Sequence, residues 1–522
     1  MDPKFAAIAE RIDNVIRNNL AQFDKPGILS IRPGYKIENG WISDTPAIVV
    51  TVYPAGTIAL PQDVDGIPVD VRAAGPFQRL RAGDPQRFAS IAARATVPGP
   101  QFPFERGRDG APVQTPTVFD LVPRSPYLPP PGGPQMHQPS APVEDDMTLT
   151  CCVGPDSGWP VLQEFLSATT NQLTVAMYDF TSRHVLDAVE QSLSGKSIKL
   201  VLDHPIPNPT SDQTDDQTKA DLALSMSNAL TFAWALTPHP SLVDEALFAN
   251  AYHIKVAVRD KRAFWLSSGN WNNSNQALLD ASGRPPGNAD RDWHIVVQHP
   301  ALAQFFDDHI NNDLETALAH QLAPGNSLAA EAPLMTELAE ADLGIAAKTM
   351  VWPAAQFERK DFQGHYRVQP VLTPENYVES MKPLLESAQT SLYIQTQYVH
   401  ASDAANDTPM MELIQILVAK QQAGLDLRLI MSEFETQKDY LEKLKMAGLD
   451  LKDVRIQSKV HNKGFVIDSR SVALGSHNWS PDGVIRNRDA TLIIHDAPDV
   501  AGYFEQVFLY DWENLAKSSI TG

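Results

Sequence analysis

Two stretches of the chain carry the same polar residues at the same spacing. They read HIKVAVRDKRAFWLSSGNW, from His253 to Trp271, and HNKGFVIDSRSVALGSHNW, from His461 to Trp479, and they align without a gap. A single H-x-K-x4-D pattern is weak evidence, but two copies, each followed by Ser-x-Asn at the same offset, indicate a repeated site. The shared polar positions are His253 and His461, Lys255 and Lys463, Asp260 and Asp468, Ser268 and Ser476, and Asn270 and Asn478.

These residue types suit the cleavage of a phosphodiester. The anionic oxygens of a diester repel nucleophiles, so catalysis needs a neutral nucleophile, neutralisation of those oxygens and a proton for the leaving group. Histidine titrates near neutrality, so one ring can attack while the other donates a proton. The lysines supply positive charge, and the serines and asparagines are candidate donors to the phosphoryl oxygens. This set requires no metal and no other cofactor.

Further acids and aromatic residues accompany both copies. Asp292, in DRDWHIVV, and Asp489, in NRDATLII, follow them in similar sequence contexts. Asp260 and Asp468 close the two motifs at the end of a strand, and we expect them to have a structural role in tying the following turn. Four tryptophans in or next to the motifs either pack in the core or contact a base or an acyl chain. They are Trp265, Trp271, Trp293 and Trp479.

The same elements precede each motif. QLTVAMYDF, a helical stretch and SIKLVLDH come before the first copy, and SLYIQTQYV, a helical stretch and LDLRLIMS come before the second. Strand, helix and strand in this order predict an α/β fold with a largely parallel sheet covered by helices. We expect the two motif strands to lie side by side across a pseudo-twofold axis, with the imidazoles of His253 and His461 roughly 4 to 8 Å apart around one phosphate.

Composition divides the chain into five segments. Residues 1–96 predict a small α/β N-terminal domain, loosely similar to modules that precede catalytic domains in some bacterial proteins, and its partner is unknown. Residues 97–146 are a Pro-rich linker, with thirteen of the 41 prolines. The two repeats are predicted at 147–330 and 368–522, with a connector at 331–367.

The paired motifs resemble the signature of the phospholipase D superfamily. The resemblance implies two pseudo-twofold-related α/β/α sandwich repeats and a covalent phosphohistidine intermediate. It makes His253 the nucleophile, while His461 protonates the departing alcohol and then activates water. It also implies that Asp489 holds His253 and that Asp292 holds His461. One departure is Ser267, where the family usually has glycine, so either the turn differs there or Ser267 donates to the ligand.

The overall composition limits the compartments in which we expect the protein and the partners that it could bind. No run of about 18 apolar residues predicts a membrane span, and the N-terminus does not read as a secretion signal. Cys151 and Cys152 are adjacent, which suits neither a disulfide framework nor a zinc site, and predicts buried thiols in a reducing cytoplasm. The formal net charge is −21. A nucleic-acid partner would therefore need a local basic groove.

The sequence does not decide between several substrate classes, because the motif residues would act only on the phosphodiester group that these classes share. Both motifs in one chain and the acidic charge favour phospholipase D-type hydrolysis of, or phosphatidyl transfer from, a phospholipid. A metal-independent nuclease acting on DNA or RNA is the alternative. Against a lipid substrate, an acidic protein approaches an anionic bilayer reluctantly. A pure binding protein is disfavoured because both motifs retain their histidine and lysine.

Overall fold

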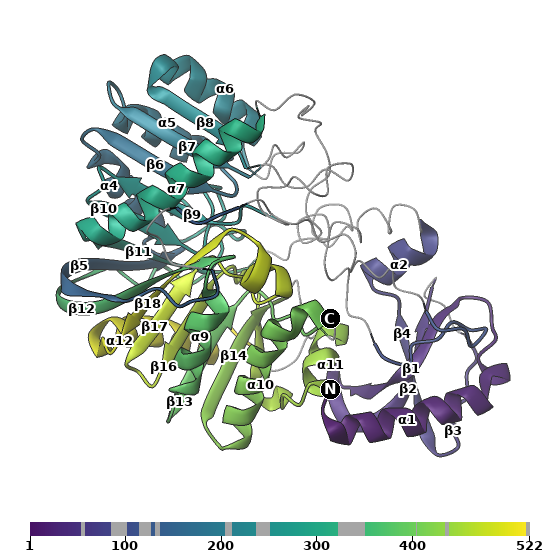
Figure 1. Ribbon diagram of the computed structural model, residues 1–522. Coiled ribbons are helices and arrows are strands. Elements are labelled where there is room, and N and C mark those ends of the chain that lie inside the picture. The colour runs from purple at the N-terminus through teal and green to yellow at the C-terminus, as the bar shows by residue number, and fades with distance from the viewer. Residues whose placement is uncertain are drawn as a thin grey trace.

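The computed structural model of the chain describes residues 1–53, 58–84, 102–113, 127–130, 136–203, 211–235, 251–321, 350–402, 405–433 and 438–517. Parts of the predicted Pro-rich linker, and residues 331–349 of the predicted connector, lie outside these ranges. Figure 1 shows a small N-terminal domain beside a larger body that is built from two halves. The predicted α/β fold, with two repeats related by a pseudo-twofold axis after a small N-terminal α/β domain, is confirmed.

The N-terminal domain packs one long helix against a four-stranded sheet in the order β1-β2-β4-β3. Asp2 caps the helix through the Lys4 backbone N–H, and Ile12 and Ile16 on its apolar face pack against the sheet. The elements are α1 (Pro3–Asn18), β1 (Ile28–Glu38), β2 (Trp41–Val52), β3 (Asp63–Val64), β4 (Ile67–Ala73) and α2 (Pro76–Gly83).

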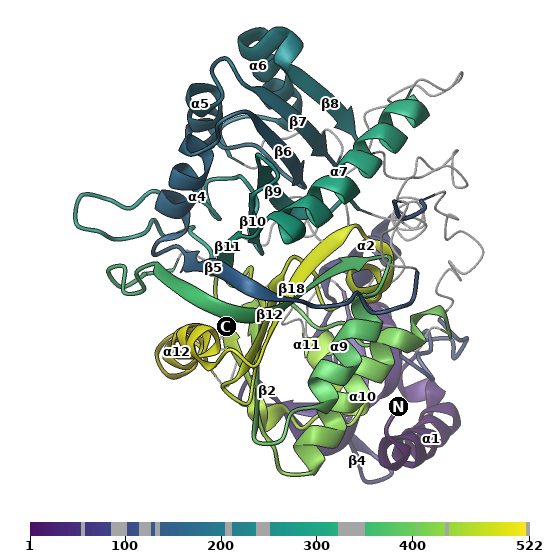
Figure 2. The same cartoon turned by 60° about the vertical axis from the view of Figure 1, so that its left-hand side comes forward.

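The body contains one 14-stranded sheet whose two halves mirror each other. Its order is β15-β14-β13-β16-β17-β18-β12-β5-β11-β10-β9-β6-β7-β8, so the pseudo-twofold axis passes between β12 and β5. Figure 2 shows these two long strands side by side between the halves. The first half contains β5 (Val143–Gly154), β6 (Gln172–Met177), β7 (Ser197–Leu202), β8 (Leu230–Trp234), β9 (Lys255–Arg259), β10 (Ala263–Ser267) and β11 (Asp292–Gln298). The second contains β12 (Lys360–Thr373), β13 (Ser391–Thr396), β14 (Asp426–Ser432), β15 (Val454–Gln457), β16 (Lys463–Ile467), β17 (Ser471–Gly475) and β18 (Asp489–His495).

The expectation of a largely parallel sheet was wrong. Only β6-β7-β8 and β13-β14-β15 pair in parallel, and all the other pairs in this sheet are antiparallel. The strand-helix-strand units recognised in the sequence form these outer strands. The motif strands instead belong to meanders, because a short turn joins β9 to β10 and another joins β16 to β17, and short turns connect antiparallel neighbours.

The expectation that the two motif strands lie side by side was also wrong. Six strands separate β9 from β16 in the hydrogen-bonded order. The halves meet instead through a shared core, in which Val256 and Val258 of β9 belong to the same buried cluster as Val466 of β16. The two motifs therefore approach each other across that core rather than along a common strand ladder.

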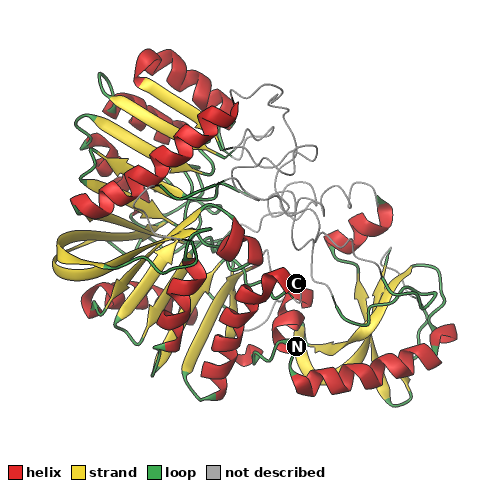
Figure 3. Cartoon of the chain, in the orientation of Figure 1, coloured by secondary structure: helices red, strands yellow, loops and turns green. Residues whose placement is uncertain are grey.

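Helices cover both halves of the sheet (Figure 3). In the shared core, α7 packs on the first half and α12 on the second. Two further cores lie beneath α4 and α5 in one repeat and beneath α9 and α10 in the other. The helices are α4 (Gly158–Ser167), α5 (Arg183–Ser192), α6 (Asp215–Met226), α7 (Pro300–Gln321), α9 (Tyr377–Glu386), α10 (Thr408–Gln422), α11 (Lys438–Met446) and α12 (Pro498–Asn514).

The four motif tryptophans all pack in these cores. Trp265, Trp271, Trp293 and Trp479 have no exposed surface. Of the two alternatives, this burial favours packing over contact with a base or an acyl chain. Cys151 and Cys152 are buried as free thiols. Among the described residues, no helix is both long and apolar enough to cross a membrane.

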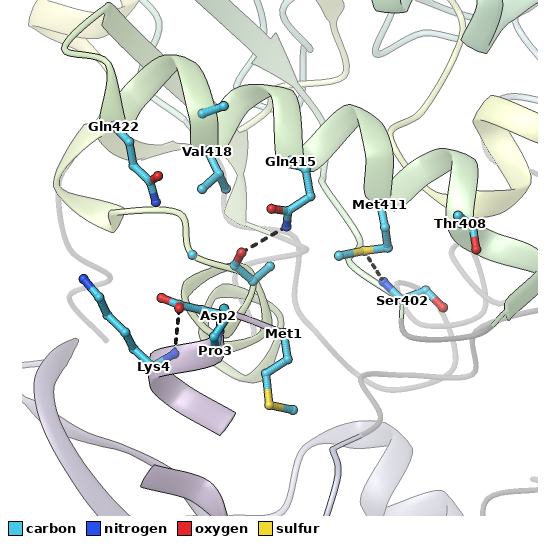
Figure 4. Close-up of a pocket in the computed structure, with 13 residues that line it drawn as sticks. Met1, Asp2, Pro3, Lys4, Ser402, Thr408, Met411, Gln415, Val418 and Gln422 are labelled. Atoms are coloured by element: carbon cyan, nitrogen blue, oxygen red, sulfur yellow. Dashed lines mark hydrogen bonds between the residues drawn. The ribbon is translucent and has the colours of Figure 1, made fainter. Parts of the chain in front are cut away.

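The N-terminal domain is fixed to the second repeat through α11. Arg32 and Arg72 both bind the buried carboxylate of Glu442, and the Tyr35 backbone N–H donates to the same group at 2.6 Å. Next to this contact, a hollow of about 740 Å³ separates the start of α1 from α10. Figure 4 shows Asp2 and Pro3 on one side of it and Met411 and Gln415 on the other.

Candidate active site

The two motif histidines come just before β9 and β16, where the chain enters the sheet. His253 is only 9% exposed, and the side chain of His461 is 15% exposed. Lys255 and Lys463 are the first residues of the two strands, and both are buried. Each lysine ammonium donates to the carbonyl of the histidine two residues before it, which fixes the ammonium beside the imidazole.

Each histidine is held by an aspartate from the opposite repeat. His253 Nδ1 lies 2.8 Å from Asp489 Oδ1, and His461 Nδ1 lies 3.1 Å from Asp292 Oδ1. Asp292 and Asp489 begin β11 and β18 and have no exposed surface. In a neutral ring this contact keeps the proton on Nδ1 and leaves the Nε2 lone pair for chemistry.

Backbone hydrogen bonds join the same segments across the two repeats. The N–H of Arg488 donates to the Ala251 carbonyl at 2.8 Å, and the N–H of His461 donates to the Arg291 carbonyl at 3.1 Å. The residue directly before each aspartate is therefore hydrogen-bonded to the backbone at, or just before, the histidine that the aspartate holds. The spacing between carboxylate and imidazole is fixed by main chain as well as by side chains.

The surroundings of the two histidines are not identical. The ring of Tyr178 meets His253 edge-on, with centroids 4.9 Å apart, and lies 5.0 Å from the Lys255 ammonium. Beside the other histidine, the Lys463 ammonium lies 3.3 Å from both ring nitrogens of His461. The sequence reasoning did not single out Tyr178, which lies outside the motif, just after β6.

The structure gives Ser268 and Ser476 a different partner from the phosphate expected from the sequence. Ser268 Oγ donates to Asp292 at 2.8 Å, and Ser476 Oγ donates to Asp489 at 2.6 Å. Both side chains are fully buried. Each hydroxyl proton therefore supports the aspartate that holds a histidine. The role of Ser268 and Ser476 toward a phosphate stays a prediction.

The motif asparagines are placed differently from the serines. Asn270 is 4% exposed and Asn478 is 6% exposed. Among the described residues, the amide oxygen of neither one has a hydrogen-bond partner. Their role as phosphate donors stays a prediction.

The acids that close the motifs are structural, but the segment they tie is not the following turn. Asp260 accepts the backbone N–H groups of residues 170–172, just before β6. Asp468 accepts those of residues 389–391, just before β13. Both aspartates have a positive φ of 53°. The carboxylates accept these hydrogen bonds because the backbone N–H groups at the start of a strand have no partner in a neighbouring strand.

Ser267, the departure from the family pattern, is hydrogen-bonded within the protein. It is fully buried, its Oγ lies 2.6 Å from His294 Nδ1, and it accepts the Gly269 N–H at 2.7 Å. The second repeat has a similar contact between a histidine and a hydroxyl, but the two residue types have exchanged strands. There the histidine, His477, follows β17, and its Nδ1 lies 2.8 Å from Oγ1 of Thr491 on β18. A side chain at Gly475, the position equivalent to Ser267, would put its Cβ 2.1 Å from the Ala490 carbonyl oxygen.

The electrostatics of the protein's own groups favour neutral imidazoles. Burial, followed by the charges of Lys255 and Lys463, lowers the pKa of His253 well below 6.5. Burial and Lys463 lower the pKa of His461 to about 4, although Asp292 acts in the opposite direction. A bound anion would offset the lysine charges and raise both pKa values.

The two aspartates differ in how readily they ionise. Burial opposes ionisation of Asp292, but His461 and neighbouring charges outweigh it and lower its pKa to about 2. Burial raises the pKa of Asp489 to about 6, because its neighbours compensate less. The hydrogen bonding of the two carboxylates also differs: Asn275 Nδ2 donates to Asp292 Oδ2 at 2.9 Å, whereas Asp489 Oδ2 has no partner among the described residues.

Two arginines that the sequence reasoning passed over anchor the site. Arg291 forms a two-bond ion pair with Asp511 of α12 in the other repeat, at 2.8 and 3.0 Å. Arg488 forms the equivalent pair with Asp313 of α7, at 2.9 Å for both bonds. Both arginines are buried. The sequence signal was present, because Arg-Asp recurs in DRDW and NRDA.

Among the residues that the structure describes, no candidate metal centre accompanies the histidines and lysines. Within the described part of the chain, no three His, Cys, Asp or Glu side chains gather in a way that could hold a metal ion. Lys255 and Lys463 would repel a divalent cation at the position between the histidines.

Comparisons with known proteins point to one family. Residues 381–512 match a family model described as "Cardiolipin synthase, PLD-like domain". The "Mitochondrial cardiolipin hydrolase" of Chlamydomonas reinhardtii is 24% identical over 104 residues. That match spans 20% of this chain and 46% of the relative, less than half the relative's length.

Two solved structures are also similar. Phosphatidylserine synthase from Haemophilus influenzae Rd KW20 matches 72% of this chain and 89% of its own, at 14% identity and a TM-score of 0.45. Nuc, a phospholipase D family member from Salmonella typhimurium, matches 29% of this chain and 95% of its own, at 21% identity and a TM-score of 0.24.

Proposed function

This chain belongs to the phospholipase D superfamily, and from that premise we propose that it is a phosphodiesterase whose two repeats act together on one phosphodiester. The observation that carries the proposal is the reciprocal pairing of His253 with Asp489 and of His461 with Asp292. Each repeat supplies the histidine of one pair and the aspartate of the other. Neither repeat alone supplies both members of either of these two pairs.

In the proposed first step, His253 attacks phosphorus through Nε2. A nitrogen–phosphorus bond forms and the bond to the leaving oxygen breaks, while His461 gives its proton to that oxygen. The buried ammonium groups of Lys255 and Lys463 offset the charge on the non-bridging oxygens. The low pKa of His253 suits this role, because a neutral ring has a free lone pair at neutral pH.

In the proposed second step, His461 removes a proton from water or from an acceptor alcohol. The resulting oxygen nucleophile attacks phosphorus, the nitrogen–phosphorus bond breaks, and His253 returns to the neutral form. His461 must hold a proton in the first step although its pKa is about 4 in the empty site. The arriving anionic diester supplies the missing stabilisation by offsetting the lysine charges.

We propose a phospholipid as the substrate class, cleaved or transferred by phospholipase D-type chemistry. The matched family model and the curated relative carry cardiolipin in their descriptions, which supports a lipid diester. The net charge of −21 argues against a polyanionic nucleic acid. The nuclease alternative is one outcome of the test that follows.

The test offers several diesters to the protein in millimolar EDTA. The panel contains phosphatidylcholine and cardiolipin vesicles, single-stranded DNA, duplex DNA and bis(p-nitrophenyl) phosphate, with the His253→Asn variant as the control. We expect release from vesicles and from the aryl diester, with both DNAs intact. DNA cleavage without vesicle cleavage would make the protein a nuclease. Activity that is lost in EDTA and restored by magnesium or zinc would overturn the histidine mechanism.

A further inference from the structure

The segments that connect the domains take part in the buried arginine clusters of the site. Tyr127, from the Pro-rich segment, lies over the Arg488 guanidinium at 4.8 Å from its ring centroid. Trp352, from the connector between the repeats, lies over Arg291 at 5.1 Å. Each arginine is therefore covered by an aromatic ring from outside its own repeat core.

Tyr127 does more than cover the arginine. Its hydroxyl accepts a hydrogen bond from Arg488 Nη2 at 3.0 Å and donates to Glu375, which itself binds Arg488. The side chain is 5% exposed, whereas the next residue, Leu128, is 75% exposed. The Pro-rich segment thus inserts the Tyr127 side chain into the body, where its hydroxyl completes a ring of hydrogen bonds with Arg488 and Glu375.

Trp352 makes no equivalent contact with the carboxylates around Arg291. Its indole N–H donates to the Ala289 carbonyl at 3.1 Å. The carboxylates that bind Arg291 are Asp511 and Asp156. The brace, by which we mean the hydrogen bonds of Tyr127 with Arg488 and Glu375, therefore has no equivalent around Arg291 among the described residues.

A short covalent and hydrogen-bonded path leads from this brace to His253. Arg488 is held at its guanidinium by Asp313, Glu375 and Tyr127, and at its backbone N–H by the Ala251 carbonyl. The next residue, Asp489, places its carboxylate 2.8 Å from His253 Nδ1. A shift of the guanidinium would therefore tilt the start of β18 and move the carboxylate relative to the ring.

We propose that Tyr127 is a positioning residue for His253, acting through Arg488 and Asp489, so that the Pro-rich segment is a working part of the catalytic half-site. The proposal rests on the assignment of His253 as nucleophile in the proposed function. A simple spacer between domains would not have this role. Tyr127 lies 361 positions before Arg488 in the sequence, yet removal of its hydroxyl should alter the chemistry of His253 and leave that of His461 unchanged.

The test compares Tyr127→Phe with Tyr366→Phe as the matched control. Tyr366 also buries most of its ring and donates its hydroxyl to a carboxylate, Asp499, at 2.6 Å, but it lies on β12 without a contact to the His-Asp pairs. In Tyr127→Phe we expect phosphoenzyme formation from bis(p-nitrophenyl) phosphate to slow by roughly tenfold, less than the ~10²-fold cost of a 1 Å misplacement. The KM should change less than twofold, and Tyr366→Phe should behave like the unaltered protein.

A second readout does not depend on turnover. Full-length protein labelled with ¹⁵N-histidine is titrated by NMR, with the His253 resonances assigned from His253→Asn. We expect the titration or tautomer signals of His253 to shift in Tyr127→Phe while those of His461 stay in place. Equal behaviour of the two tyrosine variants in this readout would overturn the proposal. Absence of activity in the unaltered protein as well as in both variants, together with a His253-specific shift, would refute the proposed function and leave the positioning role standing.

Discussion

The half-sites around His461 and His253 follow the same plan but support their aspartates differently. Asp292 accepts hydrogen bonds from both Ser268 and Asn275, whereas Asp489 accepts one from Ser476. In the second repeat, the residue that aligns with Asn275 is Gly483. A Cβ at Gly483 would lie 2.1 Å from the Asn478 carbonyl oxygen, so the backbone there leaves no room for a second side-chain donor.

This difference supports the proposed assignment of two different chemical roles to the two copies of the motif. A firmly ionised Asp292 stabilises a protonated ring, which is what a general acid needs. Asp489 has a pKa of about 6 and supports a protonated ring less, which suits a nucleophile that must stay neutral. The assignment of His461 as acid and His253 as nucleophile therefore has a physical basis in the carboxylates.

The largest expected effect comes from removing each histidine in turn. His253→Asn should abolish turnover and prevent any trapped phosphoenzyme, because no nucleophile remains. His461→Asn should slow turnover, yet with a p-nitrophenyl leaving group, which needs little protonation, the covalent intermediate should accumulate. Rapid-quench labelling with a ³²P-labelled diester measures both. Accumulation in His253→Asn instead would exchange the two roles.

A smaller effect should follow from making the half-sites alike. Asn275→Ala removes the second donor from Asp292, which raises its pKa towards that of Asp489 and weakens the protonated form of His461. Loss of a hydrogen bond to a charged group corresponds to roughly 1.5–3 kcal/mol, so we expect roughly a ten- to hundredfold loss of kcat with an alkyl leaving group. With p-nitrophenol as leaving group the loss should be less than about twofold. Equal losses for both substrates would contradict the acid role.

The smallest effect concerns the pH profile. Asp489 is ionised at pH 7 and becomes protonated as the pH falls through about 6, so activity should decline on that acid limb. Ser476→Ala removes a donor that lowers this pKa, and the limb should move to higher pH by less than about one unit. Ser268→Ala should leave the limb unchanged, because the pKa of Asp292, about 2, lies far below it. Profiles of kcat/KM from pH 4.5 to about 8 for both variants test this.

Much of the site could be predicted because the motif residues have few alternative uses. Two buried histidines with lysines two positions later, repeated in one chain, suit little other than a shared anionic substrate. The serines could not be resolved from sequence, because a hydroxyl can donate to a phosphate or to a carboxylate equally well. In the fold, Ser268 and Ser476 donate to Asp292 and Asp489, a contact that the sequence does not reveal.

The errors in the fold have a similar origin. The strand-helix-strand pattern identified the outer strands correctly, but it contains no information on β10, β11, β17 and β18, which form antiparallel meanders. Arg291 and Arg488 were passed over because their partners, Asp511 and Asp313, lie on helices far away in the sequence. Only the assembled pseudo-twofold body brings these pairs together.

The central claim is that the two repeats form one site in which His253 carries the phosphoryl group. The most direct measurement traps the full-length protein with a ³²P-labelled diester in EDTA, digests it at alkaline pH, where phosphohistidine survives, and locates the label by mass spectrometry. The account predicts a single labelled histidine, His253, with no label when either His253 or Asp489 is replaced. Label on His461, on both histidines in the same sample, or on no histidine despite turnover would contradict it.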